Sequence, residues 1–356
     1  MGRLTDHFEH RTRETHNEGW SELWESNEES LWDRGMPSPA LIDFLEKRPE
    51  HLPAAPSGRR LRALVPACGR GYEVVVLALH GFDAYGVEVS QTAVDACEVY
   101  ATAQLGRPEA YNFGPGSSSA QEAGVRGKIK FMVGDFFKRD WEAECREHGD
   151  AGFDLIYDYT FLCAILPEMR LDWARRVKEL LAPEGILVCL EFPMYKDVDA
   201  AGPPYGLKGV YWDLLVEGGN GIVGGGGGRA GLEPKPTGQE GKLERGLYYQ
   251  PGRTYEVGEG TDMYCNFMVA ETRLWKSGVG FMTVNGLEIQ KLPVVYGVTY
   301  MHLANKELDN PASVSGTLYS SVHLYYLVSG SMLVLVHLTD ISWPHRSRTR
   351  PGGLPF

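Results

Sequence analysis

Two glycines and an acid are spaced to form a ligand site at the end of a strand. The apolar run "LRALVPAC" breaks at Gly69 and Gly71, a helical pattern follows, and about twenty residues later a second short strand ends on Glu88. A strand that ends in a glycine turn and opens a helix leaves backbone N–H groups unpaired and lets a ligand approach the main chain. A carboxylate that ends the next strand accepts both hydroxyls of a ribose. This spacing indicates a site for an adenosine cofactor.

The third glycine of a dinucleotide-binding fingerprint is absent. The pattern G-x-G-x-x-G would place it at position 74, where the chain has Val74. Because that glycine packs the helix tightly against the pyrophosphate site, its absence favours S-adenosyl-L-methionine, which carries a ribose but no phosphate. An NAD-dependent oxidoreductase stays open as an alternative, although the sequence shows no hydride-transfer site. Preferential binding of a nicotinamide cofactor would support that alternative.

A second acid ends another predicted strand. In "VGDFF", Asp135 is followed by Phe136. The carboxylate would accept a hydrogen bond from the adenine amino group, and the ring would cover the adenine face. Taken alone, the same residues also fit a strand end beside a core phenylalanine.

The apolar periodicity places these groups at strand ends. It predicts a helix through Trp20 and Trp24 and a second helix over 40–45. It then predicts strands at 61–66 and 84–89 and strands within 128–137, 153–166 and 185–192, with helices at 72–80, 91–104 and 169–181. Strands that alternate with helices indicate an α/β fold with a mainly parallel sheet.

Composition restricts the partners. A net charge of -12 argues against nucleic acid or an anionic membrane, because both need a basic surface. The six cysteines form no CxxC pair and no metal-ligand spacing, so we expect neither zinc nor disulfides. The N-terminus has no apolar signal core, which predicts a cytoplasmic protein. Nothing in the sequence indicates an oligomeric state.

Three regions are expected from composition. The charged character of residues 1–17 predicts a flexible arm. Residues 18–264 are expected to form the main domain, with loop inserts at 106–127 and 218–246. Residues 265–356 form an atypical extension. Its apolar run 318–338 is long enough for a membrane span, but its serines, histidines and glycine favour strands or a poorly folding segment.

Several stretches together resemble a known family. They are "GWSELWESNEESLWDRGMPSPAL", "RALVPACGRGY", "GVEVS", "VGDFF", "FDLIYDYTFLCAILPEMRLDWA" and "GPPYGL". They resemble the thiopurine methyltransferase superfamily, and more closely its thiol and halide methyltransferase branch of plants and fungi, over about residues 18–262. The resemblance implies the class I S-adenosylmethionine-dependent methyltransferase fold, with a mainly parallel seven-stranded sheet and helices on both faces. As a member of this branch, the chain would transfer a methyl group to a small thiol or a halide.

The resemblance also implies a cofactor pocket. Three tryptophans would wall the donor, the glycine turn would pass beneath its methionine part, one acid would bind the ribose, and two residues would hold the adenine beside a strand-end tyrosine. These residues are Trp20, Trp24, Trp32, Ala67, Gly69, Glu88, Asp135, Phe136 and Tyr159.

Two of these positions depart from the family pattern. Ala67 stands where the branch usually has glycine, and Trp32 lies one residue farther from Trp24 than the pattern. An alanine is tolerable there at negative φ, whereas a positive φ would cost about 1 kcal/mol or more.

The expected reaction is an in-line displacement on a sulfonium, whose leaving group is neutral. A thiolate or halide acceptor needs no strong base, in agreement with the absence of an evident catalytic pair. Asp158 or Tyr159 would position an acceptor or order the cofactor, and Arg34 would attract an anionic acceptor or fix its own turn. Cys163, on an apolar segment, is expected to be core.

Two questions stay open in the sequence. It does not choose among bisulfide, organic thiols, thiopurines and halides, because no motif specifies the acceptor. The extension and Ala67 also leave room for a non-catalytic methyltransferase-like protein, which would bind the donor tightly without transfer.

Overall fold

The computed structural model of the chain describes residues 2–115, 126–145, 152–223 and 243–269, together with four short strands between 281 and 323. The chain divides into two units, Met1–Ala270 and Glu271–Phe356. The boundary therefore follows the last strand of the first unit instead of falling at residue 264 within it.

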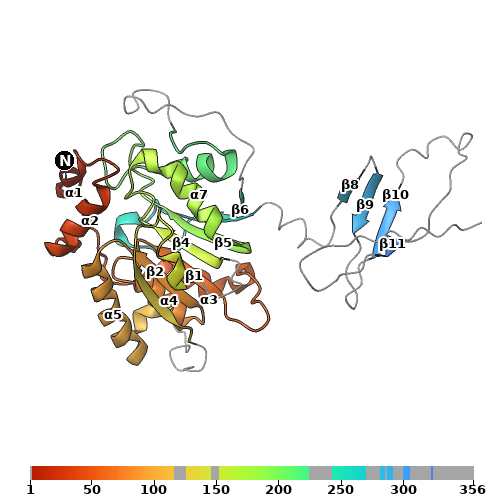
Figure 1. Cartoon of the computed structure of the whole chain (residues 1–356), viewed down its shortest axis with the longest axis horizontal. Coiled ribbons are helices and arrows are strands. Elements are labelled where there is room, and N and C mark those ends of the chain that lie inside the picture. Colours follow the sequence, from red (N-terminus) through yellow and green to blue (C-terminus); the bar gives the residue numbers. More distant parts are fainter. Residues whose placement is uncertain are drawn as a thin grey trace, which may run out of the picture. The chain divides into compact units, whose positions relative to one another are not determined.

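The first unit is built on one seven-stranded sheet in the order β3-β2-β1-β4-β5-β7-β6 (Figure 1). The strands are β1 Arg62–Pro66, β2 Asp83–Glu88, β3 Ile129–Val133, β4 Phe153–Tyr159, β5 Leu181–Glu191, β6 Leu243–Tyr249 and β7 Met263–Val269. Neighbours from β3 to β5 are parallel, and β7 runs antiparallel to both β5 and β6. The predicted mainly parallel seven-stranded sheet is confirmed.

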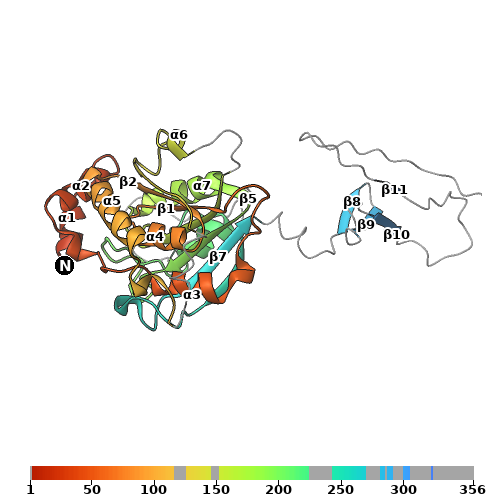
Figure 2. The same cartoon turned by 90° about the horizontal axis from the view of Figure 1, so that it is seen from below.

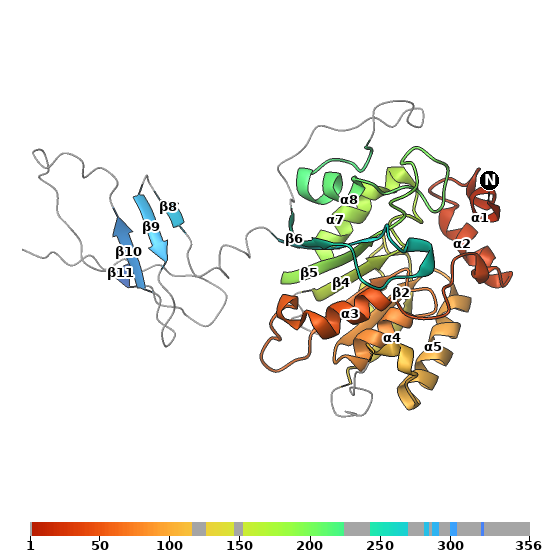
Figure 3. The same cartoon turned by 180° about the vertical axis from the view of Figure 1, so that it is seen from behind.

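Helices cover both faces of this sheet (Figures 1 and 3). One face carries α3 Pro39–Lys47, α4 Tyr72–Leu79 and α5 Gln91–Gly106, and the other carries α7 Arg170–Leu180 and α8 Val210–Trp212. Ser38 and Ser90 cap α3 and α5 by accepting the N–H groups of Leu41 and Ala93. Each face buries its own apolar cluster, as expected for an α/β layer fold.

The predicted flexible arm at 1–17 is wrong. Residues Arg3–Phe8 form helix α1, and α2 begins at His16 and ends at Glu25 (Figure 2). Phe8 is 2% exposed and packs against Trp20 at 4.7 Å between ring centroids. The charged letters of this segment obscure an apolar pair, Leu4 and Phe8, spaced at i, i+4 on one helical face.

The predicted loops are only partly described. Ala110–Asn112 forms a short turn whose Asn112 donates to Gln104 at 2.6 Å, and residues 116–125 lie outside the described residues. The second predicted loop ends earlier than expected, because β6 begins at Leu243; its residues 224–242 also lie outside the description.

The second unit is described through four strands. They are β8 Phe281–Val284, β9 Leu287–Lys291, β10 Tyr300–Ala304 and β11 Val322–His323, in an antiparallel sheet of order β11-β10-β9-β8. Apart from β11, the apolar run 318–338 lies outside the described residues. Within the described part of the chain, we find no helix with the length and apolar character to cross a membrane.

Candidate functional site

A cavity of about 190 Å³ opens at the carboxyl ends of β1, β2 and β4. Strands β1 and β4 are the neighbours between which the strand order reverses, and this switch point is where open α/β sheets bind ligands. The structure brings every residue of the expected cofactor pocket to this cavity: Trp20, Trp24, Trp32, Ala67, Gly69, Glu88, Asp135, Phe136 and Tyr159. Arg34 lines it as well. Asp158 is not among its lining residues.

The turn after β1 is held in the left-handed region. Gly69 has φ 55° and Gly71 has φ 76°, and α4 begins at the next residue, Tyr72. A side chain on Gly71 would also meet the ring of Phe131 at 2.7 Å. Glycine is therefore required at position 71 by both backbone conformation and packing.

Ala67 adopts the costly conformation. Its φ is 47°, and Thr160, at the end of β4, has φ 73°. These are two of the three non-glycine residues with positive φ in the described part of the chain, and both line the cavity. Backbone strain of this kind concentrates where a protein holds a ligand site in place.

Replacing Ala67 with glycine is expected to raise the free energy of unfolding by about 0.5–1 kcal/mol. Relief of the left-handed alanine contributes about 1–2 kcal/mol, and the extra freedom of glycine in the unfolded chain offsets part of it. Urea denaturation measures the change. Ala101→Gly, inside helix α5, is the control and should lose about 1 kcal/mol. Equal losses in both variants would show that Ala67 is unstrained.

Glu88 is buried with both carboxylate oxygens oriented. Oε1 accepts the N–H groups of Val89 at 2.7 Å and Ser90 at 3.3 Å, and Oε2 accepts that of Gly69 at 3.2 Å. Burial raises the pKa of Glu88, while the three N–H donors oppose this rise. The carboxylate thus ties the end of β2 to the glycine turn and presents a fixed acceptor to the cavity.

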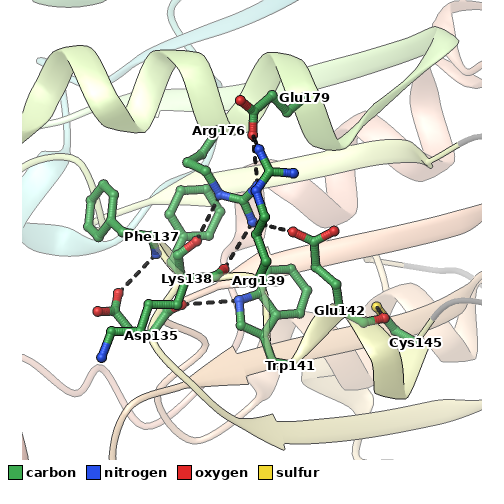
Figure 4. A network of polar contacts seen from close by, with 10 residues as sticks. Asp135, Phe137, Lys138, Arg139, Trp141, Glu142, Cys145, Arg176 and Glu179 are labelled. Atoms are coloured by element: carbon green, nitrogen blue, oxygen red, sulfur yellow. Dashed lines mark hydrogen bonds and ion pairs between the residues drawn. The ribbon is translucent and has the colours of Figure 1, made fainter.

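The loop after β3 is held in place by a buried arginine of α7 (Figure 4). Arg176 of α7 donates to the carbonyl oxygens of Phe136 at 3.2 Å and Lys138 at 3.1 Å, and to Oε1 of Glu142 at 2.7 Å. Trp141 adds a bond from Nε1 to the Asp135 carbonyl at 3.1 Å. The sequence analysis missed Arg176, although its position three residues after Trp173 places both on the buried face of the amphipathic helix.

The three tryptophans form one aromatic wall. Trp32 meets Trp20 and Trp24 edge to face, with ring centroids 5.3 and 5.5 Å apart. The short turn Glu29–Leu31 immediately precedes Trp32. Next to Trp20, burial lowers the pKa of His16 to about 4, so its imidazole is neutral at pH 7. Electron-rich rings in this arrangement attract a cation such as a sulfonium.

The segment that carries Trp32 is fastened to the glycine turn. Arg70 pairs with Asp33 and with Glu29, each at 2.7 Å. Asp33 also accepts the Gly35 N–H at 2.7 Å, so this aspartate fixes the turn beside Arg34. Arg34 itself is exposed on the cavity rim, and the described residues give its guanidinium no carboxylate partner.

The strand-end candidates on β4 face opposite sides. Tyr159 lines the cavity, stacks on Tyr255 with centroids 5.4 Å apart, and donates to Asp262 at 2.9 Å. Asp158 is fully buried and accepts from Trp173 Nε1 at 2.8 Å and Leu162 N at 3.2 Å. We therefore assign Asp158 to the packing of α7 against the sheet instead of to an acceptor.

Cys163 is buried at the cavity wall. It is 2% exposed, and its thiol donates to the Thr160 carbonyl at 3.2 Å. Burial raises the pKa of Cys163, first of all by desolvating its thiolate. A thiol with a raised pKa is a poor nucleophile at neutral pH, which agrees with a packing role.

The fold should lose stability as pH rises through the titration of Asp158. Burial raises its pKa from 3.8 to about 6, so the protonated form favours the folded state. At about 1.4 kcal/mol per pKa unit, ionising Asp158 costs about 3 kcal/mol between pH 4 and pH 7. Urea denaturation over this range should show a loss about 3 kcal/mol larger in the wild type than in Asp158→Asn, because only the contribution of Asp158 is removed. Parallel pH profiles in the two proteins would contradict this assignment.

Comparisons with known proteins place these residues in a family. The profile of the thiopurine S-methyltransferase family matches residues 15–219. The "Probable thiol methyltransferase 2" of Arabidopsis thaliana is 35% identical over 201 residues, 56% of this chain and 72% of that protein. The "Thiocyanate methyltransferase 1" of Brassica oleracea is 34% identical over 56% of this chain and 71% of its own length. A "Thiopurine S-methyltransferase" of Pseudomonas fluorescens is 30% identical over 55% and 84%.

Proposed function

The chain belongs to the thiopurine S-methyltransferase family, and we propose that it methylates bisulfide, a small organic thiol or a halide in the cavity described above. It is an S-adenosyl-L-methionine-dependent S-methyltransferase. When bound, the donor supplies a methyl group activated by a sulfonium, and displacement releases a neutral thioether. One observation carries the proposal: the residues that suit each part of this donor line a single cavity at the switch point of the sheet.

The cavity fits the donor part by part. Glu88, already oriented by backbone N–H groups, would accept the ribose hydroxyls. Asp135 and Phe136, on the loop that Arg176 clamps, would hold the adenine. The turn at Ala67 and Gly69 would approach the methionine part.

The remaining walls position the acceptor. The aromatic wall and the ring of Tyr159 exclude water from the reacting atoms, and exclusion of water favours a displacement between aligned groups. Arg34 on the rim would attract an anionic acceptor, since it is the lining guanidinium that no carboxylate neutralises among the described residues. The plant relatives are a thiol methyltransferase and a thiocyanate methyltransferase by name, which supports acceptors of this small sulfur-containing class.

We further propose that the enzyme works in the cytoplasm and does not bind nucleic acid. All six cysteines are free and buried, which suits a reducing compartment. The net charge of -12 supports a small-molecule acceptor over a polyanion.

The proposal is tested by measuring S-adenosylhomocysteine formation with bisulfide, 2-mercaptoethanol or iodide as the acceptor. Formation of S-adenosylhomocysteine that increases with the concentration of one of these acceptors supports the proposed function. Tight donor binding without product from any acceptor would favour a non-catalytic protein. Calorimetric binding of NAD in preference to the methyl donor would support an oxidoreductase instead.

A further inference from the structure

A tyrosine on the cavity wall leads to a buried carboxylate that the sequence analysis did not identify. Tyr159 donates from its hydroxyl to Oδ2 of Asp262 at 2.9 Å. Thr254 donates to the same oxygen at 2.6 Å and fixes its position. Tyr159 lines the cavity, whereas Asp262 lies behind it and is 1% exposed.

The carboxylate of Asp262 is held in an unusually poor environment for a negative charge. Its Oδ1 is buried without a hydrogen-bond partner among the described residues, and Gly258 packs directly against the group. The groups that face it are the hydroxyls of Thr254 and Tyr159 and, at longer range, the phenol of Tyr157. Burial raises the pKa of Asp262, while Thr254 and Tyr159 partly oppose this rise. A carboxylate in this state accepts a proton more readily than an exposed one.

We propose that Tyr159 and Asp262 form a proton relay that accepts the proton of a thiol substrate during methyl transfer, an inference that rests on the proposed function. The relay extends the reaction from acceptors that already carry charge to thiols that enter the cavity protonated. Thr254 is a positioning residue that keeps Oδ2 aligned with the tyrosine hydroxyl.

The transfer balances in one concerted step. The S–H bond of the acceptor breaks and its proton goes to Oη of Tyr159, while the proton already on Oη goes to Oδ2 of Asp262. The electron pair left on the acceptor sulfur forms the new S–C bond, and the pair of the broken sulfonium–methyl bond leaves with the thioether. Burial raises the pKa of Tyr159, so a free phenolate is disfavoured and the two proton movements must be coupled. After product release, the proton returns through Tyr159 to water.

A second tyrosine–carboxylate pair in the cavity is less suited to this role. Tyr255 donates to the Met36 carbonyl at 2.7 Å, which is closer than its contact with Oε1 of Glu73 at 3.2 Å. The backbone carbonyl of Met36 does not accept the tyrosine proton outright, so Tyr255 cannot pass its proton on through this hydrogen bond.

The test compares a thiol with an acceptor that carries no proton. The kcat/KM of the full chain and of Asp262→Asn is measured for 2-mercaptoethanol and for thiocyanate between pH 6 and pH 10. At pH 7 we expect the variant to lose about 100-fold more activity on the thiol than on thiocyanate. This deficit should shrink as pH passes the thiol pKa, because the solution then supplies thiolate. Tyr159→Phe should show the same dependence on acceptor and pH.

Two further measurements separate the relay from a folding defect. Calorimetric affinity for S-adenosylhomocysteine in Asp262→Asn should lie within about threefold of the wild type, which reports an intact donor site. The matched control is Glu191→Gln, another buried carboxyl-to-amide change, at a residue that does not line the cavity. This control should show equal effects on the two acceptors.

The outcomes distinguish the relay from the proposed function. Equal losses on both acceptors, or a thiol deficit that persists at pH 10, would overturn the relay while leaving methyl transfer intact. If the thiol is a substrate and thiocyanate is not, the pH dependence of the thiol deficit in Asp262→Asn alone decides whether the relay exists. A wild-type chain that methylates neither acceptor would refute the proposed function and the relay with it.

Discussion

Replacing Glu88 with alanine is expected to weaken binding of the methyl donor by at least about 100-fold. The carboxylate is the group placed to accept the ribose hydroxyls, and charge-assisted hydrogen bonds are worth about 1.5–3 kcal/mol each. The change also frees the N–H groups of Gly69, Val89 and Ser90, which the side chain now holds. Calorimetric titration with S-adenosylhomocysteine measures the affinity directly.

The controls isolate the charge of Glu88 from its shape. Glu88→Gln keeps the size of the side chain and should still lose much of the affinity, because an amide cannot accept with both ends. Glu98→Gln, on the exposed face of α5, should bind the donor as the wild type does. Wild-type affinity in Glu88→Ala would place the ribose elsewhere and remove the main argument for the pocket.

Arg176→Met should lower the free energy of unfolding by about 3–5 kcal/mol, because removing one partner of a buried ion pair leaves the other uncompensated. Both side chains are deeply buried, with 7% of Arg176 and 6% of Glu142 exposed, and the Phe136 and Lys138 carbonyls lose their donor as well (Figure 4). Methionine retains an apolar stem of similar length, so the loss reports the polar contacts. Urea denaturation is the measurement.

The neighbouring arginine provides the matched control for this prediction. Arg175 has 65% of its side chain exposed and meets Asp172 at 3.3 Å on the helix surface. Arg175→Met should therefore cost less than about 1 kcal/mol. If the two variants were equally stable, the clamp on the loop after β3 would have no energetic role, and the position of Asp135 and Phe136 would need another explanation.

Local patterns were sufficient to predict the strands and the glycine turn. An apolar run of strand length followed by glycine encodes β1 and the opening of α4 within about fifteen residues, so no distant contact is needed. The same holds for the carboxyl ends of β2 and β3, which carry Glu88 and precede Asp135. Because parallel strands share one carboxyl edge, positions predicted one by one meet in a single cavity.

The role of Asp158 could not be predicted from the motif alone, because the motif does not show which side of the sheet the side chain faces. It is adjacent to Tyr159 in "DYT", but successive strand residues point to opposite sides of a sheet. Tyr157 and Tyr159 therefore line the cavity, while Asp158 turns toward Trp173 of α7.

Contacts between distant parts of the chain could not be predicted from local patterns. Asp262 contacts Tyr159 across about 100 residues, and Arg176 contacts the loop after β3 across about 40. The packing of α1 is of the same kind, since Thr5 donates to the Pro203 carbonyl at 3.2 Å. Each of these contacts depends on chain topology, which spacing along the sequence does not encode.

The most direct test of methyl transfer to a small acceptor is headspace gas chromatography. The full-length chain is incubated with S-adenosyl-L-methionine and, in parallel, with bisulfide, a small thiol or iodide. We expect a volatile methylated product from at least one acceptor, and the relative yields rank the three. A folded protein that binds the donor and releases no volatile product from any of them would contradict the proposed acceptor class.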